Sequence, residues 1–184
     1  MRNILMIDLE TTGTLPGCRV LSIGADGFDK NGEPVQFYKR LRVADQAVNG
    51  LKDEESTMSW WKKQPKKIYD EAWSGDEDTN LSIAEFKAFF YKNFSIARGE
   101  NFTVWSKGSD FDFPILRHLF MVYGYKLPWE FCMQRDYRTL SNTHREIVFE
   151  ERNEGKHSAL EDAKAQTRGL RKFFEDHPNA CARP

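Results

Sequence analysis

The stretch Asn3-Ile4-Leu5-Met6-Ile7-Asp8-Leu9-Glu10 decides where the sheet and the chemistry of this chain are expected. Its apolar part is too short for a helix and has polar neighbours, so we expect a buried β-strand over Asn3–Ile7. Side chains alternate along a strand, so Asp8 and Glu10 should share one face while Leu9 points to the other. Two carboxylates about 7 Å apart on one face repel each other unless a cation lies between them. Such a pair suits Mg²⁺ or Mn²⁺, but a solvated strand end gives the same pattern.

The rest of the chain predicts more strands and then helices around this first strand. Strands are expected over Val20–Phe28, Val35–Leu41 and Phe102–Trp105, and Phe131–Asp136 is the candidate for a fifth. Helices are expected over Ser56–Asp70 with an interruption at Pro65, and over Leu81–Phe94, Phe113–Tyr123, Tyr137–Arg145 and Ala159–Glu175. Ser82 and Glu85 form a capping box that should start the second of these helices. This order predicts an α/β fold, a mixed sheet with its first three strands antiparallel and helices on its faces.

Length and composition fit a single domain, which we expect over residues 1–178 with a frayed tail at 179–184. The 184 residues include 27 basic and 28 acidic side chains, so the net charge of −1 excludes a strongly basic coat for nucleic acid. The three cysteines are far apart, which argues against a disulfide framework and for a reducing compartment. No run is apolar enough for a membrane helix or a good signal peptide. We therefore expect a cytoplasmic protein without membrane contact.

A further acidic candidate follows the fourth strand, in Phe111-Asp112-Phe113-Pro114. Asp112 could serve a metal site, or it could simply cap the helix that begins here, with Pro114 tolerated in the first turn. Asp110 is a rival carboxylate two residues earlier, and spacing does not choose between the two.

The segment from His157 to Asp162 carries a more specific pattern. Ser158 and Glu161 form an S-x-x-E capping box, so a helix should start at Ser158. His157 and Asp162 then occupy the two positions that normally hold the hydrophobic staple, which makes them neighbours in space. A histidine beside a carboxylate on a non-helical segment can approach a bound water and act as a general base. The competing interpretation is an exposed surface histidine.

Asp8, Glu10, Asp112, His157 and Asp162 occur in the order D-x-E, D, H-x₄-D, and this pattern closely resembles the DEDDh family of 3′→5′ exonucleases, whose fold is similar to ribonuclease H. The matching stretches are MIDLETTGT, VLSIGA, VWSKGSDFDFPILR, PWEFCMQRDYRTL and HSALEDAKAQ. They are similar to the small phage and bacterial branch that includes mycobacterial exoribonuclease-like and phage exodeoxyribonuclease-like proteins. The resemblance implies that the four carboxylates are metal ligands and favours Asp112 over Asp110. It also implies that His157 and Glu10 are catalytic.

The same resemblance implies hydrolysis from the 3′ end of single-stranded DNA or RNA to nucleoside 5′-monophosphates, with DNA slightly favoured and two divalent ions, Mg²⁺ or Mn²⁺, as cofactors. Leu9 and Thr11 would contact the terminal nucleotide. A catalytically silent nucleic-acid-binding or assembly module of the same fold is the alternative, and a homo-oligomer is compatible with either function.

An aromatic and basic segment, Trp60-Trp61-Lys62-Lys63-Gln64-Pro65-Lys66-Lys67, also fits a nucleic-acid surface. Rings stack on bases and lysines attract phosphates, although one core tryptophan beside a solvated lysine face would give the same sequence. A similar tryptophan pair in the family favours Trp61 as a residue that lines the substrate groove. Asp136, in another family-like stretch, is expected to be a structural partner of an arginine and not a fifth ligand.

Overall fold

A computed structural model describes residues 3–94, 102–145, 147, 157–178 and 180. Its centre is a five-stranded mixed sheet in the order β3-β2-β1-β4-β5. The strands are β1 (Ile4–Thr11), β2 (Val20–Phe28), β3 (Pro34–Arg40), β4 (Thr103–Ser106) and β5 (Gln134–Asp136). Strands β1 to β3 pair antiparallel, whereas β4 pairs parallel with β1 and β5 parallel with β4. The predicted mixed sheet with three antiparallel strands is confirmed.

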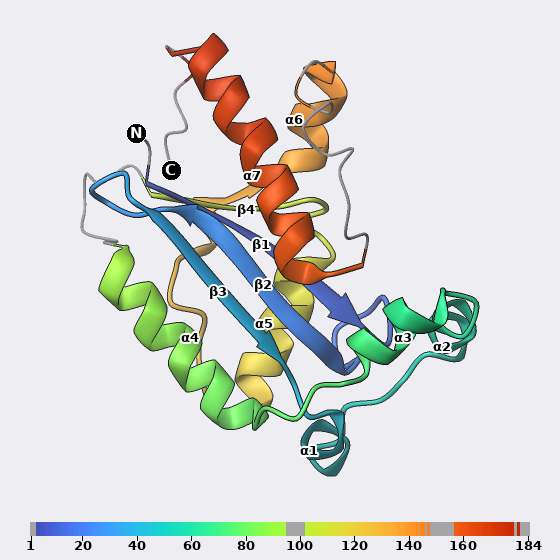
Figure 1. Ribbon diagram of the computed structural model, residues 1–184. Coiled ribbons are helices and arrows are strands. Elements are labelled where there is room, and N and C mark those ends of the chain that lie inside the picture. Colours follow the sequence, from blue (N-terminus) through green and yellow to red (C-terminus); the bar gives the residue numbers. More distant parts are fainter. Residues whose placement is uncertain (1–2, 95–101, 146, 148–156, 179, 181–184) are drawn as a thin grey trace.

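Helices cover both faces of this sheet (Figure 1). The α-helices are α1 (Val43–Val48), α2 (Glu55–Trp61), α3 (Lys66–Ala72), α4 (Thr79–Asn93), α5 (Asp112–Val122), α6 (Tyr137–Thr143) and α7 (Ala159–Asp176). Helix α7 lies over one face with α6 beside it, and α4 and α5 lie on the opposite face. Helices α2 and α3 lie beyond the end of β1, so three different parts of the chain meet at that end of the sheet.

The alternation of side chains along β1 explains how the sheet divides the core. Leu5, Ile7 and Leu9 belong to the larger apolar cluster, together with residues of α4 and α5. Ile4 and Met6 belong to a second cluster, with residues of α6 and α7. Because side chains alternate along a strand, Asp8 and Glu10 lie on the same face of β1 as Ile4 and Met6. The carboxylates therefore replace apolar side chains where β1 reaches the N-terminal end of α7.

A glycine on the neighbouring strand brings α7 close to this point. Gly24 of β2 pairs with Asp8 of β1. A Cβ atom at Gly24 would lie 2.1 Å from the carbonyl carbon of Ala159, the first residue of α7. The start of α7 can therefore rest on the sheet only because residue 24 has no side chain. This contact sets the height of α7 above Asp8.

Several element boundaries differ from the sequence prediction. The predicted strand Phe131–Asp136 is a strand only from Gln134 onward, because 131–133 form a 3₁₀ turn. Helix α4 begins at Thr79, since Asp78 and not Ser82 caps it by accepting the Leu81 backbone N–H. Helix α1 was not predicted, whereas the break at Pro65 between α2 and α3 is confirmed. Of the predicted frayed tail, only residue 180 lies within the described part.

In the part of the chain that the structure describes, every helix is too short or too polar to cross a membrane.

Candidate active site

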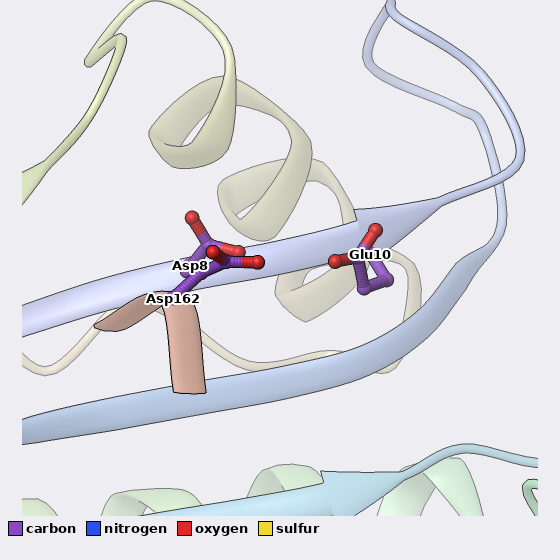
Figure 2. A group of neighbouring side chains, drawn as sticks. All are labelled: Asp8, Glu10 and Asp162. Atoms are coloured by element: carbon purple, nitrogen blue, oxygen red, sulfur yellow. The ribbon is translucent and has the colours of Figure 1, made fainter. Parts of the chain in front are cut away.

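Three carboxylates meet where β1 ends and α7 begins. Asp8 and Glu10 come from β1 and Asp162 from the first turns of α7, and one oxygen of each lies within 4.8 Å of the others. Figure 2 shows the Asp162 side chain extending from the helix toward Asp8, with Glu10 farther along the strand. The expected common face of Asp8 and Glu10 is therefore present, and a distant helix adds a third acid to it.

Asp112 approaches this group from the other side of β1. Its side chain is 3% exposed, and its Oδ1 accepts a hydrogen bond of 3.2 Å from the Leu9 backbone N–H. Helix α5 has Phe111 as its N-cap and no side-chain cap hydrogen bond, so the competing interpretation of Asp112 as a cap is wrong. Asp112 lies outside the group of three, although its charge acts on Asp8. The rival Asp110 is exposed.

Burial and mutual repulsion make these carboxylates unusually weak acids. Burial raises the pKa of Asp8 well above its ordinary value, and the charges of Asp112, Glu10 and Asp162 raise it further. Burial, then Asp162 and Asp112, raise the pKa of Glu10 to about 8. Burial raises the pKa of Asp112 to about 7, against the Leu9 hydrogen bond. A cation bound among these oxygens would remove the repulsion, so the donor set fits a hard divalent ion.

His157 stands directly before α7 with a left-handed backbone, φ 72°. Its backbone N–H donates to Asp162 Oδ2 at 3.1 Å, so the predicted proximity of the two residues is confirmed. The predicted capping box is not formed, because the N-cap Ser158 makes no side-chain cap hydrogen bond and Glu161 pairs with Lys164. The carboxylate that accepts from the backbone before the helix is that of Asp162, at the His157 N–H, and not that of Glu161. The same carboxylate thus joins the acidic group and fixes the backbone of His157.

Two tryptophans of α2 hold the imidazole from the opposite side. The Trp60 and His157 ring centroids are 4.9 Å apart, and those of Trp61 and His157 are 6.2 Å apart. Trp60 is 41% exposed, whereas Trp61 is 1% exposed and donates its Nε1–H to the Thr11 carbonyl at 2.8 Å. Trp61 is thus the core tryptophan of the alternative interpretation, although it also lines the cavity described below. Sequence reasoning nominated Trp61, and the more accessible ring is Trp60.

These residues line one cavity of about 480 Å³, the active-site cavity. It includes Asp8, Glu10, Asp162, His157, Leu9, Thr11, Phe111 and both tryptophans. The Leu9 side chain belongs to the apolar core, and the Thr11 hydroxyl donates to the Gly13 carbonyl at 2.6 Å. The described lining of the active-site cavity contains no lysine or arginine. The lysines at 62 and 63, in the turn after α2, and those at 66 and 67, on α3, are exposed beside this cavity.

Two polar residues around the site have roles that the sequence did not reveal or revealed in part. Gln166, 4% exposed, donates from Nε2 to Asp8 Oδ1 at 3.0 Å. The sequence signals were its position one helical turn after Asp162 and its place as the last residue of the family-like stretch HSALEDAKAQ. Asp136 is structural as predicted, but its carboxylate accepts from the backbone N–H groups of Ser109 and Thr139, where an arginine was expected.

The mixed five-stranded sheet with helices on both faces is a ribonuclease H-like fold. Its structural neighbours are ribonuclease H-like exonucleases, including the nuclease domain of 3′hExo, a DEDDh family member bound to rAMP (TM-score 0.59, 12% identity, 98% of this chain and 94% of that one). Exonuclease I of E. coli bound to a 5cy-dA13 oligonucleotide matches at TM-score 0.58 and 18% identity over 97% of this chain. This chain spans 42% of the Exonuclease I chain.

Sequence comparison then gives the family. The model of the Rv2179c-like 3′-5′ exoribonuclease domain matches residues 3–174, so the chain belongs to that family and carries a 3′-5′ exonuclease domain. An exodeoxyribonuclease of Enterobacteria phage T4 is 29% identical over 158 residues, which are 73% of this chain and 68% of the phage protein.

Proposed function

We propose that the protein is a divalent-metal-dependent exonuclease that removes nucleoside 5′-monophosphates from the 3′ end of single-stranded nucleic acid. The observation that carries this proposal is the meeting of Asp8, Glu10 and Asp162 with His157 in one cavity, with Asp112 near enough for its charge to act on Asp8. Family membership supports the direction of cleavage. The cavity of about 480 Å³ has the size of a small-molecule site, which suits one terminal nucleotide.

Asp8, Glu10, Asp112 and Asp162 would hold two Mg²⁺ or Mn²⁺ ions. The support is the donor set itself, in which partly buried carboxylates lie together with no lysine or arginine in the described lining of the cavity. Bound ions would stabilise negative charge on the scissile phosphate and on the leaving oxygen, and would make water easier to deprotonate. Positive charge from metal also explains how a chain of net charge −1 attracts a polyanion.

His157 would act as the general base. His157 lies on a non-helical segment, its amide is held by Asp162 and its ring packs against Trp60. These contacts place the imidazole in the lining of the cavity. It would take a proton from the attacking water while the water oxygen bonds to phosphorus and the bond from phosphorus to the 3′ oxygen breaks. The leaving 3′ oxygen would take up a proton from solvent. The products are a nucleoside 5′-monophosphate and a chain with a new 3′-hydroxyl.

Residues that line the cavity next to the carboxylates would position the terminal nucleotide. Leu9 and Thr11 line the cavity directly beside the carboxylates, and Trp60 and Trp61 face them from α2. The exposed part of Trp60 offers a ring for stacking on a base, whereas Trp61 mainly supports the Thr11 backbone through its hydrogen bond.

Single-stranded DNA is the proposed preferred substrate, because the phage relative that matches most of this chain is an exodeoxyribonuclease. RNA is the second candidate, and the description of the family as exoribonuclease-like favours it. DNA and RNA differ at the 2′-hydroxyl, so the cleavage rates of DNA and RNA oligonucleotides of one sequence show which substrate is preferred.

The test uses 5′-labelled single-stranded DNA and RNA of one sequence with Mg²⁺, Mn²⁺ or EDTA. We expect a ladder that shortens from the 3′ end in both metals and no cleavage in EDTA. Asp112→Asn should abolish the ladder, and Asp110→Asn is the matched control because this exposed acid lies only two residues away. Cleavage in EDTA, internal cuts, or equal effects of the two substitutions would contradict the proposal.

A further inference from the structure

A second cavity, of about 270 Å³, lies next to the active-site cavity and has the opposite charge character. We call it the α5 cavity, because Pro114, Arg117, His118 and Met121 of helix α5 line it together with Pro16 and Ser109. Its described lining contains a guanidinium and an imidazole and no aspartate or glutamate. The active-site cavity contains acidic residues and no lysine or arginine in its described lining.

Two chain segments separate the cavities and contribute to both. Thr14 lines the active-site cavity and Pro16 the α5 cavity, and in the same way Phe111 lines the first and Phe113 the second. Residues two apart are separated by at most about 7 Å along the chain. A strand that leaves the active-site cavity across either segment therefore reaches the α5 cavity within a short distance.

Neither Arg117 nor His118 is used to hold the fold. Within the described residues, no hydrogen bond, ion pair or ring contact involves either side chain. Arg117 is exposed, and Met121 beside it is 62% exposed. An arginine without a protein partner presents its planar fork of donors to solvent, which is the geometry that binds phosphate oxygens. The adjacent Pro114 and Met121 provide apolar surface for a sugar or a base.

We propose that the α5 cavity binds the nucleotides immediately upstream of the 3′ end of a single-stranded polynucleotide, with Arg117 on a backbone phosphate. This inference rests on the proposed function, because it requires the terminal nucleotide to lie in the active-site cavity. The catalytic carboxylates cannot attract upstream phosphates. The α5 cavity supplies positive charge just outside them, where the next phosphates of the strand must pass.

The test compares a substrate that fills only the active-site cavity with one that reaches beyond it. The short substrate is the p-nitrophenyl ester of thymidine 5′-monophosphate, and the long one is a ten-residue oligothymidylate. We expect Arg117→Ala to lower the ratio of kcat/KM for the long over the short substrate about 10-fold, as expected for loss of one charge-assisted contact. Arg117→Glu should lower it further. Arg171→Ala, which removes an exposed arginine paired with Glu175 on α7, is the control and should leave the ratio unchanged.

A binding measurement keeps this test separate from the proposed function. Fluorescence anisotropy of the labelled ten-residue strand, with Ca²⁺ in place of Mg²⁺, reports affinity without turnover. Arg117→Ala should weaken binding and reduce the dependence of log K on log salt by about 0.7, the value for one phosphate contact of a single strand. An unchanged ratio and salt slope in both Arg117 variants would overturn the inference, as would a larger effect from Lys62→Ala with Lys63→Ala. A wild-type protein that binds the strand through Arg117 but hydrolyses neither substrate would overturn only the proposed function.

Discussion

At the scale of single residues, the site depends on side chains that face one another from β1, α5 and α7. His157 carries the imidazole of the set, and its backbone N–H donates to Asp162 of the acidic group. Its ring packs against Trp60, at 4.9 Å between the ring centroids. The backbone and the ring of His157 thus have separate partners, which allows the ring to be removed while Asp162 keeps its place.

We expect His157→Ala to lower turnover at least ~100-fold, because the general base is lost, and to leave metal affinity nearly unchanged. Single-turnover kinetics and calorimetric titration with Mn²⁺ measure the two quantities on the same preparation. His177→Ala, which removes a histidine at the far end of α7, serves as the control. Parallel losses of turnover and metal affinity would identify His157 as a ligand.

Gln166 is expected to position Asp8 for metal binding. Its Nε2 donates to Asp8 Oδ1, whereas its buried Oε1 has no hydrogen-bond partner among the described residues. Gln166→Leu removes the donor and also an unsatisfied acceptor, so we expect about 10-fold weaker Mg²⁺ binding without loss of thermal stability. Thermal unfolding in EDTA and a Mg²⁺ titration of activity separate the two effects. A purely structural role would instead lower the unfolding temperature and leave the Mg²⁺ midpoint in place.

At the scale of secondary-structure elements, the approach of α7 to the sheet assembles the site. Gly24→Ala would place a Cβ 2.1 Å from the Ala159 backbone, so the start of α7 must move and carry His157 and Asp162 away from Asp8. We expect lower stability, by about 1–3 kcal/mol or more, and much weaker metal binding by the protein that still folds. Circular dichroism and Mn²⁺ titration measure the two.

Gly27→Ala is the matched control for this prediction, because its Cβ would lie equally close, 2.1 Å, to the Ile4 carbonyl oxygen. Residue 27 pairs with Leu5, toward the start of β1 and away from Asp8. The Gly27→Ala protein should lose stability, while the fraction that folds keeps its metal affinity. Equal losses of metal affinity in the two variants would show that the Gly24 contact has no special effect on the site.

The sequence predicted those features that depend on neighbours along the chain. Strand alternation placed Asp8 and Glu10 on one face, and the start of α7 placed His157 beside Asp162. Contacts between distant segments were not predictable from local pattern. Asp112 with the Leu9 amide is one, Gln166 with Asp8 is another, and the contact of Gly24 with α7 is the third. Each depends on how elements pack, and only the family resemblance chose Asp112 in advance.

At the scale of the whole molecule, a nearly neutral chain concentrates negative charge at one partly buried site. The net charge is −1, yet Asp8, Glu10, Asp112 and Asp162 lie in or beside a single cavity. Without metal, the burial and mutual repulsion of these carboxylates therefore lower the stability of the folded protein when they are ionised. The burial that prepares them to bind cations makes the metal-free protein sensitive to pH.

The stability of the metal-free protein should fall as pH rises from about 5 to about 8. The unfolded chain releases the Glu10 proton near the ordinary pKa of 4.5, whereas the folded protein keeps it until about 8. The unfolded state thus binds fewer protons in this range, so the free energy of unfolding decreases with pH. The raised pKa of Asp112, about 7, acts in the same direction.

Mg²⁺ should reverse this loss, because it binds the ionised carboxylates of the folded state and has little affinity for the unfolded chain. Thermal unfolding at pH 5, 7 and 9, in EDTA and in Mg²⁺, tests this, and the rise in melting temperature with Mg²⁺ should be greatest at pH 9. Glu10→Gln cannot ionise at this position, so its stability in EDTA should decline less with pH than that of the wild type. If Mg²⁺ raised the melting temperature equally at all three pH values, the acidic group would not be where the metal acts on stability.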